Sequence, residues 1–181
     1  SDQDKLLDSW EMANFGNLAS SNGSGDADFD GLSDENEFLA GTNPNWAFHV
    51  IADYVILEKN QTVDIPLSNL LLNDFNPNNW NLSISSVTKT GAGTPSMPSD
   101  VRFVPLNGSL AADKFQYTAI RTGYATPDSS GDVNITIVNA ASDNTASIMN
   151  GTSKSEIIFG GVNGSTINPA GGDDIIYGKN G

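Results

Sequence analysis

The chain has no cysteine and only one histidine, His49, among its 181 residues. Without cysteine there is no disulfide, no zinc thiolate site and no thiol nucleophile, and one histidine excludes a multi-histidine metal site. Basic residues are also scarce, because 8 Lys and Arg stand against 22 Asp and Glu, a formal net charge of −14. Nucleic acids and anionic membrane surfaces both require a basic face, so we expect neither as a partner.

Long apolar runs are missing as well. Hydrophobic residues make up 38% of the chain, and no run approaches the roughly 18 to 20 residues that cross a bilayer. No charged and then apolar leader opens the chain, so the sequence predicts neither a membrane insertion nor a targeting segment. What so many carboxylates do suit is a hard cation with oxygen ligands, above all calcium.

The acidic residues are concentrated at the start of the chain. Residues 1–45 hold ten acidic residues and one basic residue, a charge of −9, while residues 46–140 and 141–181 share the remaining −5. This distribution predicts three segments. A solvated, disordered tail would explain the acidic composition equally well, so the spacing of the acids has to decide.

The twelve residues from Asp26 to Glu37, DADFDGLSDENE, match the pattern D-x-[DN]-x-[DN]-G-x5-E at every specified position. In such a loop, positions 1, 3 and 5 point into one cavity, and a glycine, here Gly31, reverses the chain. The loop predicts a calcium site, with a solvated acidic turn as the alternative. A short helix over 34–40, ended by Gly41, should follow. The predicted ligands are Asp26, Asp28, Asp30, the backbone carbonyl of Leu32, Asp34 directly or through water, and bidentate Glu37.

The first residues form a second, truncated copy of this loop. Aligning Glu11 with Glu37 assigns its ligands, but Lys5 takes the usual glycine position, so we expect an incomplete or distorted loop. A helix over 9–15 should bury Trp10 in a small core rather than present it as a ligand platform. The candidate ligands of this copy are Asp2, Asp4, Leu6, Asp8 and Glu11.

The two loops, in the form D-x-D-x-D-G-L-S-D-x-x-E followed by a helix and G-T-N-P, resemble a known family. They are similar to the thrombospondin type 3-like and dockerin-like EF-hand repeats of large secreted bacterial proteins. The resemblance covers residues 1–45 and implies calcium binding, without specifying a protein partner.

Residues 46–140 read as short strands separated by turn residues, which predicts an antiparallel β-sandwich. The expected strands cover 50–57, 63–67, 82–88, 101–105, 115–120 and 133–138. The run ADYVILEKNQTVDIPLSNLLLND and the strands after it resemble bacterial cadherin-like or Ig-like repeats. His49 is predicted to begin a strand, without a functional role.

That family has an N-D-x-D-P-D segment, which here reads Asn73-Asp74-Phe75-Asn76-Pro77-Asn78. Two alternatives stay open for it. Asp74 could bind calcium with help from Asn76, Asn78 or Asp53, or the Asn and Pro residues could simply form a turn.

From Gly151 the chain has a nine-residue period, with Met149, Ile158, Ile167 and Ile176 all at the eighth position. This is the register of the repeat G-G-x-G-x-D-x-U-x, in which the eighth side chain points inward. The segment resembles hemolysin-type (RTX) calcium-binding repeats, which implies the start of a parallel β-roll and a calcium ligand at Asp174. A glycine-rich linker is the alternative. Because the chain stops at the fourth position of a further repeat, we expect it to be a fragment of a longer protein with neighbouring domains.

Together these patterns predict a mostly β fold, with an Ig/cadherin-like sandwich over 46–140. A small α EF-hand-like module should precede it over 1–45, and a β-roll should begin within 141–181. The predicted function is a calcium-dependent structural or adhesive segment of a secreted or cell-surface bacterial protein, with glycans or a surface or matrix molecule as possible partners. A carbohydrate-binding module is the alternative. An enzyme with paired carboxylates is disfavoured, because the best acids already belong to a metal loop.

Overall fold

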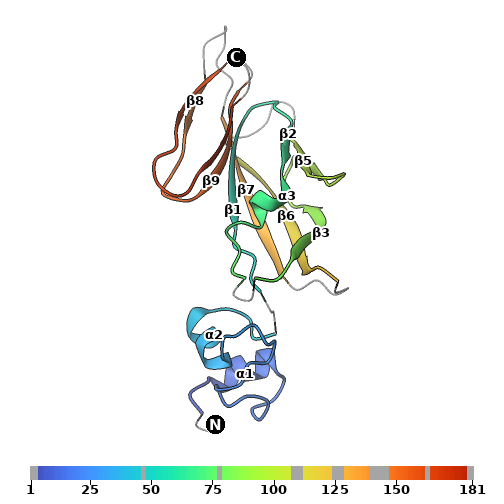
Figure 1. Ribbon diagram of the computed structural model, residues 1–181, viewed down its shortest axis with the longest axis vertical. Helices are drawn as coiled ribbons and strands as arrows, with labels where there is room; N and C mark the ends of the chain where they lie inside the picture. The colour runs from blue at the N-terminus through green and yellow to red at the C-terminus, as the bar shows by residue number, and fades with distance from the viewer. Residues whose placement is uncertain are drawn as a thin grey trace.

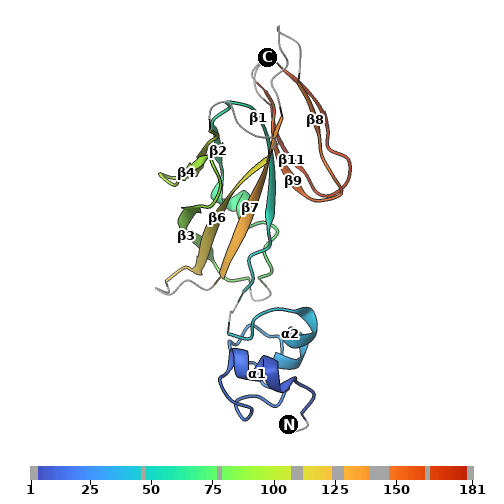
Figure 2. The same ribbon diagram turned by 180° about the vertical axis from the view of Figure 1, so that it is seen from behind.

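The computed structural model describes residues 4–45, 48–76, 79–106, 112–123, 129–138, 147–161 and 164–178. The molecule is elongated, with the helices α1 and α2 near its N-terminus and the strands β8 to β11 around its C-terminus at the opposite end (Figures 1 and 2). We call the described part of residues 4–45 the N-terminal module, and the described part of residues 48–178 the β region. No helix in the described ranges is long and apolar enough to cross a membrane.

The N-terminal module contains two seven-residue helices, α1 (Asp8–Asn14) and α2 (Asp34–Ala40). α2 covers the residues predicted for it, because its local signals are complete. Ser33 accepts a hydrogen bond from the amide of Asn36 at its N-terminus, and Gly41 ends it in the left-handed conformation (φ 74°). The ring of Trp10 packs edge-on against Phe15 and Phe38, at centroid distances of 5.7 and 5.4 Å, which joins the two helices.

Strands dominate the β region and form three sheets. The largest has six strands in the order β11-β9-β1-β7-β6-β3, and the others are β2-β5-β4 and β10-β8. The strands are β1 (Asp53–Glu58), β2 (Val63–Ile65), β3 (Leu82–Lys89), β4 (Thr94–Ser96), β5 (Val101–Val104), β6 (Ala112–Arg121), β7 (Ser129–Val138), β8 (Ser147–Asn150), β9 (Glu156–Phe159), β10 (Ser165–Asn168) and β11 (Ile175–Tyr177).

The prediction of a purely antiparallel arrangement was wrong in one respect, because the largest sheet is mixed. Strand β1 runs parallel to both of its neighbours, β7 and β9, while β6 pairs antiparallel with β7 and β3. The alternation of apolar residues indicates which face of a strand is buried. It carries no information about the direction of the neighbouring strand.

Strand β1 is buried on both faces, as its consecutive apolar residues Val55, Ile56 and Leu57 indicate. Val55 and Leu57 belong to the main core, with apolar side chains of β2, β5, β6 and β7, whereas Ile56 lies in a second cluster with Met149 and Ile158. The β2-β5-β4 sheet therefore covers one face of the largest sheet, and the β10-β8 pair covers the other.

Two elements of the β region were not predicted. Strand β4 contains Pro95, and the four-residue helix α3 (Leu67–Leu70) begins at the last residue of the strand predicted over 63–67. Both are short, and proline is depleted in strands, so neither has a periodicity that a sequence pattern can detect.

The nonapeptide segment forms two parallel pairs of strands. β8 pairs with β10 and β9 with β11, and in each pair the partners are 18 residues apart, as Ser147 with Ser165 and Ile158 with Ile176. Successive nonapeptides therefore alternate between two sheets. The eighth-position residues Met149 and Ile158 are fully buried between these sheets and Ile167 packs against them, while Ile176 is 47% exposed.

Candidate metal centre

The acidic loop, residues 26–37, is curled by hydrogen bonds from its own backbone amides. Asp26 accepts from the amides of Asp30 (3.1 Å) and Gly31 (3.0 Å), and Asp30 accepts from the amide of Leu32 (2.7 Å). Gly31 has φ 95°, the left-handed conformation that reverses the chain. These contacts turn the carboxylates of the first half of the loop toward one another.

The structure brings four of the six predicted ligands, Asp26, Asp28, Asp30 and Glu37, into two overlapping groups, one of which also includes His49. Ligand atoms of Asp26, Asp28 and Asp30 lie within 4.8 Å of one another, and so do those of Asp30, Glu37 and His49. Asp30 belongs to both groups and so links the first half of the loop to the closing Glu37. Carboxylate oxygens at these separations suit a hard divalent cation.

Asp34 occupies a different position from the other predicted ligands. Its buried carboxylate accepts hydrogen bonds from the hydroxyl of Ser21 and from the amide of Ala27 (3.1 Å), and its own amide donates to Gly25 (2.8 Å). Asp34 therefore braces the loop against the preceding turn. Glu35, next to it, forms an exposed ion pair with Lys5 at 3.1 Å.

The charges of the acidic loop are costly without a cation. Burial, together with the neighbouring carboxylates, raises the pKa of Asp28 to about 7 and that of Glu37 to about 8, and burial also raises the pKa of Asp30. Oδ2 of Asp28 and Oε2 of Glu37 are buried and accept no hydrogen bond from the described residues. Buried carboxylate oxygens without donors are what a bound cation would satisfy, so the residues present fit calcium.

His49 is a member of this centre that the sequence interpretation missed. It lies in the β region, where its backbone pairs with Phe75 through two hydrogen bonds of 3.0 Å. Its Nε2 lies 3.6 Å from Oε1 of Glu37 and 4.0 Å from Oδ2 of Asp30. Burial lowers its pKa, and the charge of Asp30 opposes that shift. A lone histidine twelve residues after the loop gives no sequence signal for this contact, because the contact depends on how the chain folds back.

The described part of the first loop, residues 4–11, repeats two backbone features of the second loop despite its lysine. Lys5 adopts φ 88°, close to the 95° of Gly31, and Asp4 accepts a hydrogen bond from the amide of Leu6 (3.1 Å) as Asp30 does from Leu32. Glu11 is fully buried, like Glu37.

The first loop nevertheless gathers its acids less closely than the acidic loop does. Asp2 lies outside the described residues. Within the described part of the chain, Asp4, Asp8 and Glu11 are not among the groups of three ligand atoms within 4.8 Å. An ion at this loop therefore stays a prediction.

At the other end of the molecule, the side chain of Asp174 is hydrogen-bonded to a backbone amide. Its carboxylate accepts a hydrogen bond of 2.9 Å from the amide of Glu156, the sixth-position residue 18 places earlier. The other two sixth-position residues, Ser147 and Ser165, are also hydrogen-bonded, at 2.9 Å. Asp174 belongs to neither of the metal-ligand groups found among the described residues, so its role as a calcium ligand also stays a prediction.

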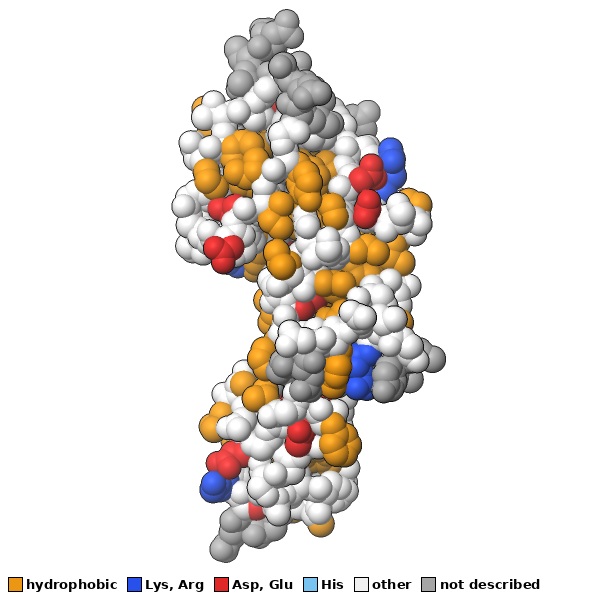
Figure 3. All heavy atoms as spheres, viewed as in Figure 1, with side chains coloured by type: hydrophobic (Ala, Val, Ile, Leu, Met, Phe, Trp, Pro, Cys, Tyr) orange, Lys and Arg blue, Asp and Glu red, His pale blue; other side chains and the backbone are white. Residues whose placement is uncertain are grey.

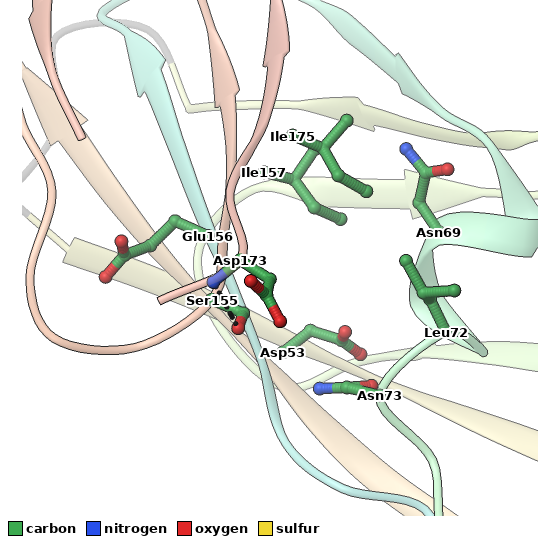
Figure 4. Close-up of a pocket in the computed structure, with 9 residues that line it drawn as sticks. All are labelled: Asp53, Asn69, Leu72, Asn73, Ser155, Glu156, Ile157, Asp173 and Ile175. Carbon is green, nitrogen blue, oxygen red and sulfur yellow. Dashed lines mark hydrogen bonds between the residues drawn. The ribbon is translucent and has the colours of Figure 1, made fainter. Parts of the chain in front are cut away.

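A separate pocket of about 360 Å³ lies between β1, the segment after α3, and β9 and β11. Figure 4 shows Asp53, Asn73 and Asp173 at one end of this pocket and Ile157 and Ile175 at the other. Burial and the nearby Asp74 raise the pKa of Asp53 to about 8.

Asp74 lies near Asp53, as the cadherin-like alternative requires, but its surroundings include protein donors. Burial raises its pKa to about 6, and the hydroxyl of Tyr117 lies 3.2 Å from both of its carboxylate oxygens while donating to the carbonyl of Leu70 at 2.8 Å. Asn76 forms a turn instead, because it bonds the amide and carbonyl of Trp80. Asn78 lies outside the described residues.

Comparisons with known proteins define no family for this chain. No family model and no curated protein matches it. A solved structure of the 2,6-sialyltransferase of Photobacterium sp. JT-ISH-224, in a ternary complex with CMP and lactose, is similar at 9% sequence identity and a TM-score of 0.30. The similarity covers 58% of this chain and 20% of the sialyltransferase, so this chain spans a minor part of that protein. A likeness this weak carries no argument about fold or function.

Proposed function

We propose that this chain is a calcium-dependent structural and adhesive segment of a larger secreted or cell-surface protein. In this proposal calcium orders the acidic loop and stiffens the junction between the N-terminal module and the β region. The carboxylates hold an ion and do not act on a substrate. The observation that carries the proposal is the acidic loop, where several carboxylates converge and two buried oxygens lack hydrogen-bond donors among the described residues.

The finer features of the fold belong to the same proposal. We infer an Ig/cadherin-like sandwich in the β region, supported by the core between the β2-β5-β4 sheet and the largest sheet. We also infer a β-roll at the C-terminal end, supported by the parallel pairing of strands 18 residues apart and by the buried eighth-position side chains. Both are architectures of large extracellular proteins in the resemblances described above.

The carbohydrate-binding alternative receives less support from the aromatic residues. The guanidinium of Arg121 lies 4.4 Å from the ring centre of Trp80, and the ammonium of Lys154 lies 3.7 Å from that of Tyr54. A ring with a cation over it does not offer that face for stacking on a sugar. Figure 3 shows hydrophobic side chains on this face of the molecule, most of them over its middle and upper part.

Calorimetric titration with calcium tests the proposed function. We expect at least one site with a dissociation constant of about 10⁻⁴ to 10⁻³ M, the range of extracellular modules. Glu37→Gln should abolish that site, because it removes the closing bidentate ligand. Glu35→Gln is the matched control, since it removes one charge from the same loop at a side chain paired with Lys5. Absence of binding in the unmodified chain, or equal loss in both variants, would refute the proposal.

A further inference from the structure

The side chain of His49 reaches out of the β region into the acidic loop. The two backbone hydrogen bonds to Phe75 fix His49 to the β region, and the two rings lie 5.9 Å apart. Its side chain is only 8% exposed, and Nε2 forms no hydrogen bond within the described chain. A buried imidazole nitrogen directed at carboxylates, and bonded to none of them, needs a partner.

The distances around Nε2 indicate what that partner is. A hydrogen bond to a carboxylate would place the atoms about 2.7 to 2.9 Å apart, and the observed separations from Glu37 and Asp30 are 3.6 and 4.0 Å. Two ligand atoms that each lie about 2.1 to 2.3 Å from one ion are about 3 Å apart at a right angle and about 4 Å apart at a wider angle. The three side chains are therefore spaced as ligands of one ion.

We propose that Nε2 of His49 is a direct ligand of the divalent ion held by the acidic loop, so that this ion ties the N-terminal module to the β region. The inference rests on the proposed function and deepens it. Three positions of a divalent ion would be filled from the two parts of the chain, by two carboxylates and one imidazole. In this arrangement the orientation of the N-terminal module depends on the ion.

A nitrogen ligand also changes which ions the loop accepts. Calcium prefers oxygen ligands, whereas imidazole suits borderline first-row ions such as Zn²⁺. With His49 the site should bind Zn²⁺ more tightly, relative to calcium, than an all-oxygen loop of the same charge. The proposed site therefore binds Zn²⁺ as well as calcium.

The junction between the two parts includes a pocket that His49 borders. The amide side chain of Asn45 donates to the carbonyl of Asn14 at 3.0 Å inside the N-terminal module. Between the module and the β region lies a pocket lined by the end of α2 on one side and by Val50, Ile51 and the start of β7 on the other. The proposed bond between His49 and the ion therefore crosses the junction beside this pocket.

Because His49 is the single histidine of the chain, the imidazole ¹⁵N signals of a uniformly ¹⁵N-labelled sample belong to this residue alone. The decisive experiment adds ¹¹³Cd²⁺, which accepts both oxygen and nitrogen ligands, to the labelled full chain. We expect Nε2 to show scalar coupling to ¹¹³Cd, together with shifts of the loop amides. Cadmium that shifts the loop amides and leaves Nε2 unchanged would overturn this inference and leave the proposed function intact. Cadmium that shifts neither would overturn both.

Ion competition supplies a second, independent readout. His49→Gln should weaken Zn²⁺ binding at least about tenfold, as expected for the loss of an anchored ligand, while calcium affinity changes by less than about threefold. Glu35→Gln, which leaves all proposed ligands in place, should change the relative affinities for Zn²⁺ and calcium by little. Amide spectra of each variant establish that it is folded. Equal losses of zinc and calcium affinity in His49→Gln would contradict a nitrogen ligand. The ¹¹³Cd coupling experiment does not depend on any variant being folded.

Discussion

Replacing Glu37 by Gln should change the stability of the N-terminal module in opposite directions with and without calcium. Glu37 is fully buried near three other carboxylates, and its pKa is raised to about 8. At pH 9 in the presence of a chelator the side chain is charged, buried and opposed by its neighbours. Gln keeps the shape and removes the charge, so the variant should be at least as stable as the parent.

In calcium the parent should be more stable than the Glu37→Gln variant. For a dissociation constant of about 10⁻⁴ to 10⁻³ M, 10 mM calcium should raise the free energy of unfolding of the parent protein by about 1.4 to 2.7 kcal/mol. The variant that lacks the closing ligand should gain close to nothing. Urea unfolding followed by the fluorescence of Trp10, in a Trp46→Phe and Trp80→Phe background, measures the module alone. Trp10 packs between the two helices of that module. A variant that gains as much from calcium as the parent, or that loses stability in chelator, would refute the reasoning.

Three further predictions follow from the same structure. Calcium affinity, measured by calorimetry, should rise between pH 6 and pH 9, because the pKa of Glu37 is raised to about 8 and its proton must leave before the ion binds. The calcium-free module should lose stability to urea over the same range, because the unfolded state releases this proton at lower pH. Affinity and stability that do not depend on pH would contradict this prediction. Met149→Ala should lower the free energy of unfolding in urea by about 2 to 5 kcal/mol, because the side chain is fully buried between two sheets. Ile148→Ala, on the exposed side of the same strand, should change it by less than about 0.5 kcal/mol, and equal effects would contradict the assigned faces. Tyr117→Phe should cost about 1 to 3 kcal/mol in the same assay, because it leaves a buried carbonyl without its donor, and an unchanged midpoint would contradict that role.

The parts of the structure that the sequence could predict are those set by local rules. The helix over Asp34–Ala40 has its capping serine and its terminal glycine in the sequence, and the acidic loop has one residue type at each required position. The nonapeptide period likewise predicts which side chains are buried, and Met149 and Ile158 are. Each of these features depends on residues close to one another in the chain.

The parts that could not be predicted depend on contacts between distant segments. Strand β1 was expected, but its position between two parallel partners depends on segments about 80 and 100 residues further along. His49 was given no function, because only the pairing with Phe75 and the fold of the junction bring it to Glu37. Lys5 predicts an incomplete or distorted first loop, yet its backbone adopts the left-handed conformation that a glycine would have, and its side chain forms an ion pair with the distant Glu35.

The position of β1 has a mechanical consequence. The chain ends lie at opposite ends of the long axis (Figures 1 and 2), and β1 is bonded to β7 on one side and to β9 on the other. A tension applied along that axis through a neighbouring protein segment would load both ladders along their length, so that their hydrogen bonds resist together instead of opening one after another. Strand β1 would then share that load with both of its neighbours.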